Sequence, residues 1–195
     1  MPGRRTHTQH GEGSSAPLGL AVADALDGDF QTFLSRVQSP SLHAMAELWD
    51  EARGDRRMPS WADLPVIGSL PYAKMLWGFG YDPVSGDLTG VLAGSKIGKW
   101  IDAKFYGQVK DQRANYGLGA LEQRLITCAA TPLAYRSKGR LFKVDSFVVT
   151  GERIALPMAA DGQTGDGIFG GSDYTAPPLL GPLELLHENC EWYAI

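Results

Sequence analysis

The order of helical and strand-like segments is the feature that most constrains the fold of this chain. Two strand-like runs, at residues 74–79 and 88–93, precede a mainly helical middle at residues 99–110 and 118–136. Three further strand-like segments follow the helical middle. Because strands cluster on both sides of the helices instead of alternating with them, the order predicts an antiparallel α+β domain.

The later strand-like segments lie at residues 141–149, 153–158 and 168–169. The 24 glycines of the chain favour turns and hairpins over a helical bundle. Residues 165–170 read Gly-Asp-Gly-Ile-Phe-Gly and match the G-x-G-x-x-G pattern. A dinucleotide site needs a helix directly after this pattern, and none is indicated. The glycines therefore predict a hairpin.

The N-terminal part is predicted to be helical after a disordered tail. Residues 1–16 are polar and rich in Gly, Ser and His, which is typical of disorder. Residues 17–40 form a predicted helical extension that is interrupted at Asp27-Gly28-Asp29. Ser41 is expected to cap a second helix that ends near Arg53.

Composition excludes several classes of protein. The net charge is −4, and the Lys and Arg residues are spread along the chain, which argues against nucleic acid as a partner. No apolar run is long enough to predict a membrane span. Arg4-Arg5 is followed by polar residues instead of the apolar core of a signal peptide. Cys128 and Cys190 are expected to be reduced thiols, and we predict a cytoplasmic protein.

The segment from Leu48 to Ser60 has the most distinctive residue order. A helix containing Trp49 runs into the turn Arg53-Gly54-Asp55-Arg56-Arg57-Met58-Pro59. This pattern resembles the Arg-Gly-x-Arg-x-Met-Pro signature of a bacterial PAS-like family of stand-alone sensory and regulatory proteins. The resemblance extends over most of residues 41–174. Its weaker marks are Asp63-x-Pro65, Gly94-Ser95, Leu156-Pro157-Met158 and Asp161-Gly162.

The resemblance implies a five-stranded antiparallel sheet with a helical connector, over residues 41–174, followed by a C-terminal tail at 175–195. PAS domains hold a small molecule between the sheet and the connector, or they dimerise. The first hypothesis is therefore a sensor that binds a small ligand and changes a contact with a partner protein. The alternative is an adaptor without a ligand that forms a homodimer through the apolar stripe of residues 18–37.

Aromatic residues near the connector are candidates for a ligand pocket, because such pockets combine aromatic walls with a few polar groups. Trp77 belongs to the same group, and a place in the ordinary core is the stronger expectation for both Trp77 and Phe147. Arg124 is the candidate polar anchor. The predicted ligand-binding residues are Trp100, Tyr106, Arg124 and Phe147.

Arg53, Arg56 and Arg57 form the sharpest cluster of charge. One interpretation is a site for an anion or an acidic partner. The other interpretation is that these cations stabilise the negative end of the preceding helix, where each contributes roughly 0.3–1 kcal/mol. The second interpretation is favoured.

The chemistry of catalysis and of cofactors is not indicated. No combination of nucleophile, base and orienting acid is visible, so we predict no enzyme. No histidine lies between residues 99 and 136, which argues against a haem held by histidine. Cys128 is followed by Ala129-Ala130 and lacks the sequence context of a photochemical flavin cysteine. Packing is the favoured role of Cys128, and the identity of any cofactor stays open.

Overall fold

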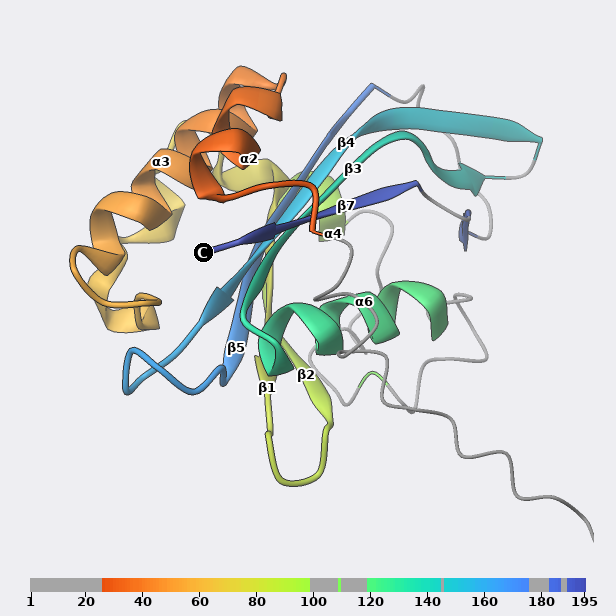
Figure 1. The fold of residues 1–195 in the computed structure, drawn as a ribbon. Coiled ribbons are helices and arrows are strands. Elements are labelled where there is room, and N and C mark those ends of the chain that lie inside the picture. Colours follow the sequence, from red (N-terminus) through yellow and green to blue (C-terminus); the bar gives the residue numbers. More distant parts are fainter. Residues whose placement is uncertain (1–25, 99–108, 110–118, 145, 176–182, 187–188) are drawn as a thin grey trace, which may run out of the picture.

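The computed structural model describes residues 26–98, 109, 119–144, 146–175, 183–186 and 189–195 (Figure 1). Its centre is a seven-stranded sheet with the strand order β2-β1-β5-β4-β3, and both β6 and β7 pair with the outer edge of β3. All pairings between these strands are antiparallel. The strands are β1 (Leu76–Tyr81), β2 (Leu88–Ala93), β3 (Leu133–Val144), β4 (Phe147–Met158), β5 (Gly167–Tyr174), β6 (Leu183–Leu185) and β7 (Cys190–Ala194).

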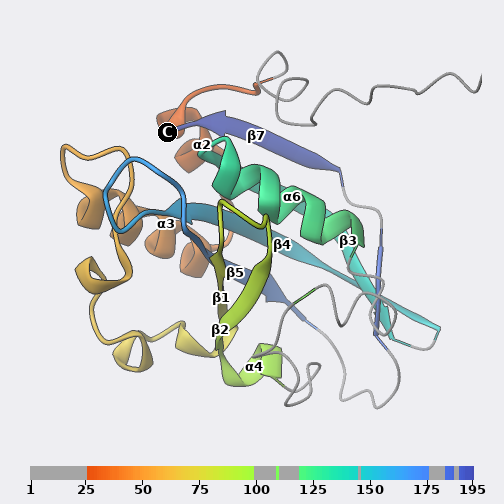
Figure 2. The same ribbon diagram turned by 90° about the horizontal axis from the view of Figure 1, so that it is seen from below.

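Helices cover both faces of the sheet. Figures 1 and 2 show α2 and α3 on one face and α6 on the other. Three short 3-10 turns connect α3 to β1, and α4 follows β2. The helical elements are α2 (Phe30–Arg36), α3 (Pro40–Arg53), η1 (Trp61–Asp63), η2 (Ile67–Ser69), η3 (Ala73–Met75), α4 (Ser95–Gly98) and α6 (Gly119–Ala130). The predicted α+β class with an antiparallel sheet is confirmed.

Several predicted segments differ from the structure. The mainly helical stretch expected at residues 118–136 ends at Ala130, because Pro132 cannot continue a helix, and β3 starts one residue after it. The single strand expected at 141–149 is the end of one long hairpin, with β3 on one side and β4 on the other. The predicted tail at 175–195 contributes β6 and β7, so the sheet has seven strands and not five.

The helix α3 starts earlier than predicted. Ser39, and not Ser41, is its N-cap, and its hydroxyl accepts a hydrogen bond from the Leu42 amide at 3.3 Å. Pro40 occupies the first turn, where its missing N–H costs nothing and its fixed φ suits a helix. Gly54 ends the helix at a φ of 54°, as its position predicted.

Trp49 is the central residue of the core between α3 and the sheet. Its side chain is fully buried, and its indole N–H donates to the carbonyl of Pro157 on β4 at 2.9 Å. Its ring lies 5.2 Å from that of Phe30, and Phe33 makes an edge contact with Tyr193 of β7. The described part of the predicted N-terminal extension therefore packs into the same core, and its phenylalanines are not available as an exposed dimer stripe.

Replacing Trp49 with phenylalanine is expected to lower the free energy of unfolding by about 1–3 kcal/mol. The substitution leaves the buried Pro157 carbonyl without its donor and leaves a space where the second ring lay. Urea denaturation would measure the loss. Tyr72→Phe is the control, because the Tyr72 hydroxyl makes only a long 3.4 Å contact with Ala44; an equal loss in both variants would contradict the assigned role of the indole.

Candidate ligand-binding site

A row of buried polar side chains crosses the sheet on the face that α6 covers. Ser137 on β3 is paired with Arg153 on β4, and Arg153 is paired with Ser172 on β5. All three residues are at most 5% exposed. Buried polar groups are costly unless they are hydrogen-bonded, so a row of this kind indicates a specific role.

Ser172 lies at the centre of a small hydrogen-bonded cluster. Its hydroxyl oxygen accepts from the indole N–H of Trp77 at 3.0 Å and from Nε of Arg153 at 3.1 Å. A hydroxyl has two lone pairs and one hydrogen, so these two bonds use its acceptor capacity. The hydroxyl hydrogen is therefore oriented as a donor. A guanidinium beside a hydroxyl donor suits a carboxylate, phosphate or carbonyl oxygen.

The glycines of β5 position this cluster. A Cβ atom on Gly170 would lie 2.2–2.4 Å from three atoms of the Trp77 ring, so the ring lies directly against the backbone of β5. On the opposite face, a Cβ on Gly171 would lie 2.7 Å from a methyl group of Leu42 on α3. Gly170, the last glycine of the G-x-G-x-x-G match, thus serves close packing on one face of the sheet, and Gly171, the residue after the match, serves it on the other. The predicted glycine-rich hairpin is confirmed by the pairing of β4 with β5.

The helix α6 closes this face with one charged and several small or apolar side chains. Glu122 is 4% exposed, and the buried hydroxyl of Thr127 donates to the Gln123 carbonyl of its own helix at 2.9 Å. Cys128 is fully buried, and this burial raises the pKa of its thiol above the ordinary value. The thiol is therefore protonated at neutral pH, which suits packing and not thiolate ligation.

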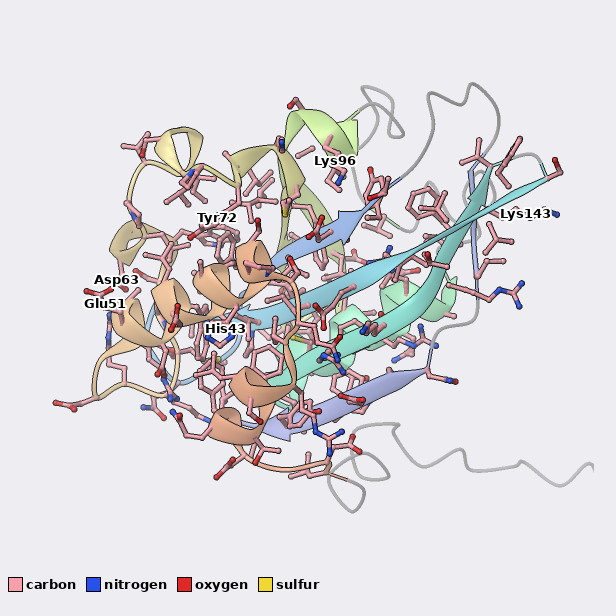
Figure 3. All side chains as sticks on the ribbon, turned by 90° about the horizontal axis from the view of Figure 1, so that it is seen from above. His43, Glu51, Asp63, Tyr72, Lys96 and Lys143 are labelled. Carbon is pink, nitrogen blue, oxygen red and sulfur yellow. The ribbon has the colours of Figure 1, made fainter. Side chains whose placement is uncertain are left out.

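The short helix α4, which follows β2, contacts the end of β5. Figure 3 shows Lys96 of α4 beside this end of the sheet. The Tyr174 hydroxyl donates to the Lys96 carbonyl at 3.0 Å, and the Lys96 ammonium donates to the Tyr174 carbonyl and lies 4.3 Å from the centre of its ring. Asp173 Oδ1 is 3.6 Å from the same ammonium. These contacts fix the point where the chain leaves the sheet after β2.

The predicted ligand-binding residues are not gathered at this cluster. Arg124 lies on α6 and is half-buried, whereas Phe147 is the first residue of β4 and is 54% exposed. An exposed ring at the end of a hairpin does not form the wall of an enclosed pocket, so the expectation for Phe147 is corrected. Trp100 and Tyr106 lie outside the described residues.

Sequence reasoning missed Arg153 and Ser172. Arg153 follows an acidic residue and Ser172 follows two glycines. Only the pairing of β4 with β5 shows that their side chains meet. The signal in the sequence was an arginine directly before the apolar run that starts at Ile154. Trp77 was expected in the core; it lies there and also donates to Ser172.

In the arginine cluster at the end of α3, Arg56 caps the helix and Arg53 forms an ion pair within it. Arg56 donates to the Ala52 carbonyl at 2.8 Å and pairs with Asp63 at 2.9 Å, and Arg53 pairs with Asp50 at 2.6 Å. The hydrogen bonds from Arg56 and Ser60 hold the pKa of Asp63 well below its usual range. Arg57 is exposed in the turn. The geometry of Arg53 and Arg56 favours the stabilising interpretation over an anion site.

A second polar cluster lies on the opposite face, beneath the junction of α2 and α3. The buried Glu152 carboxylate accepts from the backbone amides of Gln38 and Ser39 and pairs with Arg136 at 2.7 Å. Arg136 also pairs with Glu191 on β7 at 2.7 Å. Burial alone would raise the pKa of Glu191, but the hydrogen bonds from Tyr193 and Arg136 lower it below its ordinary value.

A shallow groove of about 320 Å³ opens beside this second cluster. It follows the α2–α3 junction and the neighbouring strands β3, β4 and β5. Ser39 also donates its hydroxyl hydrogen to Asp173 in this groove at 2.7 Å. The groove is lined by Gln38, Ser39, Lys138, Gly139, Thr150, Gly151, Glu152 and Asp173.

Comparisons with known proteins add no assignment. No family model, no curated protein and no solved structure matches this chain. Among the described residues, no three His, Cys, Asp or Glu side chains are grouped so that they could hold a metal ion. The described helices are also all too short or too polar to cross a bilayer.

Proposed function

We propose that this chain is a cytoplasmic PAS-type regulatory protein that binds a small acidic or carbonyl-bearing ligand on the α6 face of its sheet. The observation that carries the proposal is the buried cluster of Trp77, Arg153 and Ser172. Its cation and hydroxyl donor are positioned by three adjacent strands, β1, β5 and β4. Ligand sites are typically apolar surfaces with a few fixed polar groups of this kind.

The order of the elements supports the PAS-like assignment. Two strands are followed by a connecting region that contains α6, and five more strands follow it, of which the first three, β3 to β5, match the number that the resemblance implies. The pairing of β1 with β5 joins the strands before α6 to those after it in one sheet. The resemblance implies an order of this kind.

The residues that carry the resemblance also contact one another. The Met58 amide donates to the Gly162 carbonyl at 3.3 Å, and the Ala159 amide donates to the Pro59 carbonyl at 2.9 Å. The Arg-Gly-x-Arg-x-Met-Pro turn therefore packs against the hairpin that contains Asp161-Gly162. Two separate marks of the resemblance are thus parts of one contact, which gives a physical reason for their occurrence in the same chain.

Native mass spectrometry of the full chain tests the proposal. We expect a small molecule that remains with the folded protein and is released on denaturation. The Ser172→Ala variant should bind the released molecule about tenfold more weakly, since it removes a donor to the ligand and the acceptor that positions Arg153. Thr127→Val is the matched control, because it removes a buried hydroxyl that is bonded within its own helix.

Two outcomes would contradict the proposal. One is a protein without a bound species that is not stabilised by any member of a library of carboxylates, phosphates and carbonyl compounds. The other is equal ligand affinity in Ser172→Ala and Thr127→Val. Urea denaturation of both variants without ligand would separate a loss of binding from a loss of folding. A protein without any bound or stabilising ligand would favour the adaptor hypothesis.

A further inference from the structure

The helices α2 and α3 cover only part of their face of the sheet. Figures 1 and 3 show the β3–β4 hairpin extending beyond these helices, with Lys143 near its far end. Residues that are paired directly across β3 and β4 lie on the same face, and Glu152 fixes this face as the one that contacts the α2–α3 junction. The uncovered half of this face carries the residues Lys138, Arg140, Lys143, Val148 and Thr150, which we name the basic sheet face.

The basic sheet face contains two different rows. Lys138 and Arg140 on β3 are exposed, and Thr150 and the 42% exposed Val148 lie on the neighbouring strand β4. Adjacent strands are about 4.8 Å apart, so a row of cations lies directly beside a row of apolar and hydroxyl side chains. One side of a partner could contact both rows together.

The positive charge of this face exceeds the negative charge of the described acidic residues around it. Glu152 is buried and paired with Arg136, which also holds Glu191. Lys138 donates to the neutral amide oxygen of Gln38. Glu184 on β6 lies opposite Lys143 in register, and Asp173 lies 3.6 Å from the Lys96 ammonium. Arg136 with its two glutamates carries one net negative charge, which the two cations Lys138 and Arg140 exceed by one. This local excess contrasts with the net charge of −4 for the whole chain.

We infer that the basic sheet face binds an acidic amphipathic helix of a partner protein. Such a helix carries an acidic stripe for the β3 cations beside an apolar stripe for Val148. The neighbouring half of the same face is already covered by α3, which packs its apolar stripe on β4 and β5. An incoming helix would extend this layer, with one end at the groove beside Gln38 and Ser39.

The position of α2 and α3 favours a helix over a membrane surface as the occupant of the basic sheet face. The helices α2 and α3 lie on top of the sheet beside the uncovered face (Figure 1). A flat bilayer approaching this face would therefore meet the two helices before it reached Lys138 and Arg140. A single helix is narrow enough to lie beside them. The inference rests on the proposed function only where it assigns the contact a role in regulation. Binding of a helix to this face can be measured without any small ligand.

Fluorescence anisotropy with synthetic peptides tests the inference. The probe is a labelled helix of about 18 residues with a glutamate stripe beside a leucine stripe, and the comparison peptides carry lysine for glutamate or serine for leucine. We expect the full chain to bind only the glutamate–leucine peptide, with a Kd on the order of 10 μM that weakens as salt is raised.

Paired variants locate the contact. Lys138→Ala/Arg140→Ala and Val148→Asp should each weaken binding about fivefold or more. Arg57→Ala and Val84→Asp are matched controls, because they change an exposed arginine and a 94% exposed valine on other parts of the chain. Their Kd values should stay unchanged. Ser172→Ala should also bind the peptide as the unmodified chain does, so a failure of the ligand proposal is distinguishable from a failure of this one.

Several results would overturn the inference. These are equal binding of the three peptides, or no difference between the variants and their controls. A change in sedimentation of the unmodified chain that Val148→Asp abolishes would identify a second copy as the occupant instead. Binding to vesicles of anionic lipid that depends on Lys138 and Arg140, without binding to the acidic peptide, would identify a membrane surface.

Discussion

Replacing Glu152 with alanine is expected to lower the free energy of unfolding by about 3–5 kcal/mol. The side chain is 4% exposed and accepts from two backbone amides, at Gln38 and Ser39, while pairing with Arg136. Without it, the Arg136 charge stays buried with Glu191 as its acidic partner, and the two amides lose their acceptor. Urea denaturation would measure the loss.

Two further variants separate these contributions. Replacing both members of the pair, as in Arg136→Met/Glu152→Leu, removes the buried charge and should recover part of the loss. The recovery is partial because the Gln38 and Ser39 amides stay unsatisfied and the partly exposed Glu191 loses Arg136 as its partner. Glu47→Ala is the surface control, since its carboxylate is 62% exposed and pairs with His43 at 3.4 Å. A loss of less than about 1 kcal/mol in Glu152→Ala would show that the cluster does not stabilise the α2–α3 junction.

The Gly170→Ala variant is expected to lose about 3 kcal/mol of stability and to displace the Trp77 ring. The new methyl group would lie 2.2–2.4 Å from ring atoms, and real contacts of this kind are never so short. Moving the indole breaks its hydrogen bond to Ser172, which alters the candidate ligand site as well. Urea denaturation and the near-ultraviolet circular dichroism of the tryptophans would measure the two effects.

The matched control is Gly68→Ala in η2, where a new Cβ would meet no atom within 4 Å. Its stability should change by less than about 0.5 kcal/mol. The double variant Gly170→Ala/Trp77→Leu should lose less than the sum of the two single variants, because the smaller side chain makes room for the methyl group. Additive losses would show that Gly170 and Trp77 do not depend on each other.

The sequence was a good guide to the class of fold and a poor guide to the site. Alternation and glycine-bounded turns predicted strands wherever one face was covered, as at Leu88–Ala93. The predicted helical stretch at 118–136 crossed Pro132, which cannot continue a helix, and residues 133–136 belong to β3 instead. These residues form a strand because they pair with β4 and β7, and such partners lie far away in the sequence.

The site depends on such non-local pairing throughout. Arg153 and Ser172 belong to different strands, and neither has a neighbour in sequence that identifies its partner. Phe147 is an aromatic residue in a strand, as a pocket wall would require, but the hairpin bend leaves it exposed. By contrast, the Arg53–Asp50 ion pair and the hydrogen bond from Arg56 to the Ala52 carbonyl join residues within about one helical turn, and the helix-stabilising interpretation that the sequence favoured agrees with these contacts.

The pairing of β1 with β5 has a consequence for the synthesis of the chain. The hairpin of β1 and β2 emerges from the ribosome long before β5. Trp77 therefore cannot pair with Gly170 until that later strand has been synthesised. At ribosomal rates this interval is on the order of ten seconds, and an isolated hairpin is only marginally stable in water. During that time the inner edge of β1, with Leu76 and Trp77, is open to pairing with other chains. A strand that lies inside the finished sheet is thus an open edge of the nascent one.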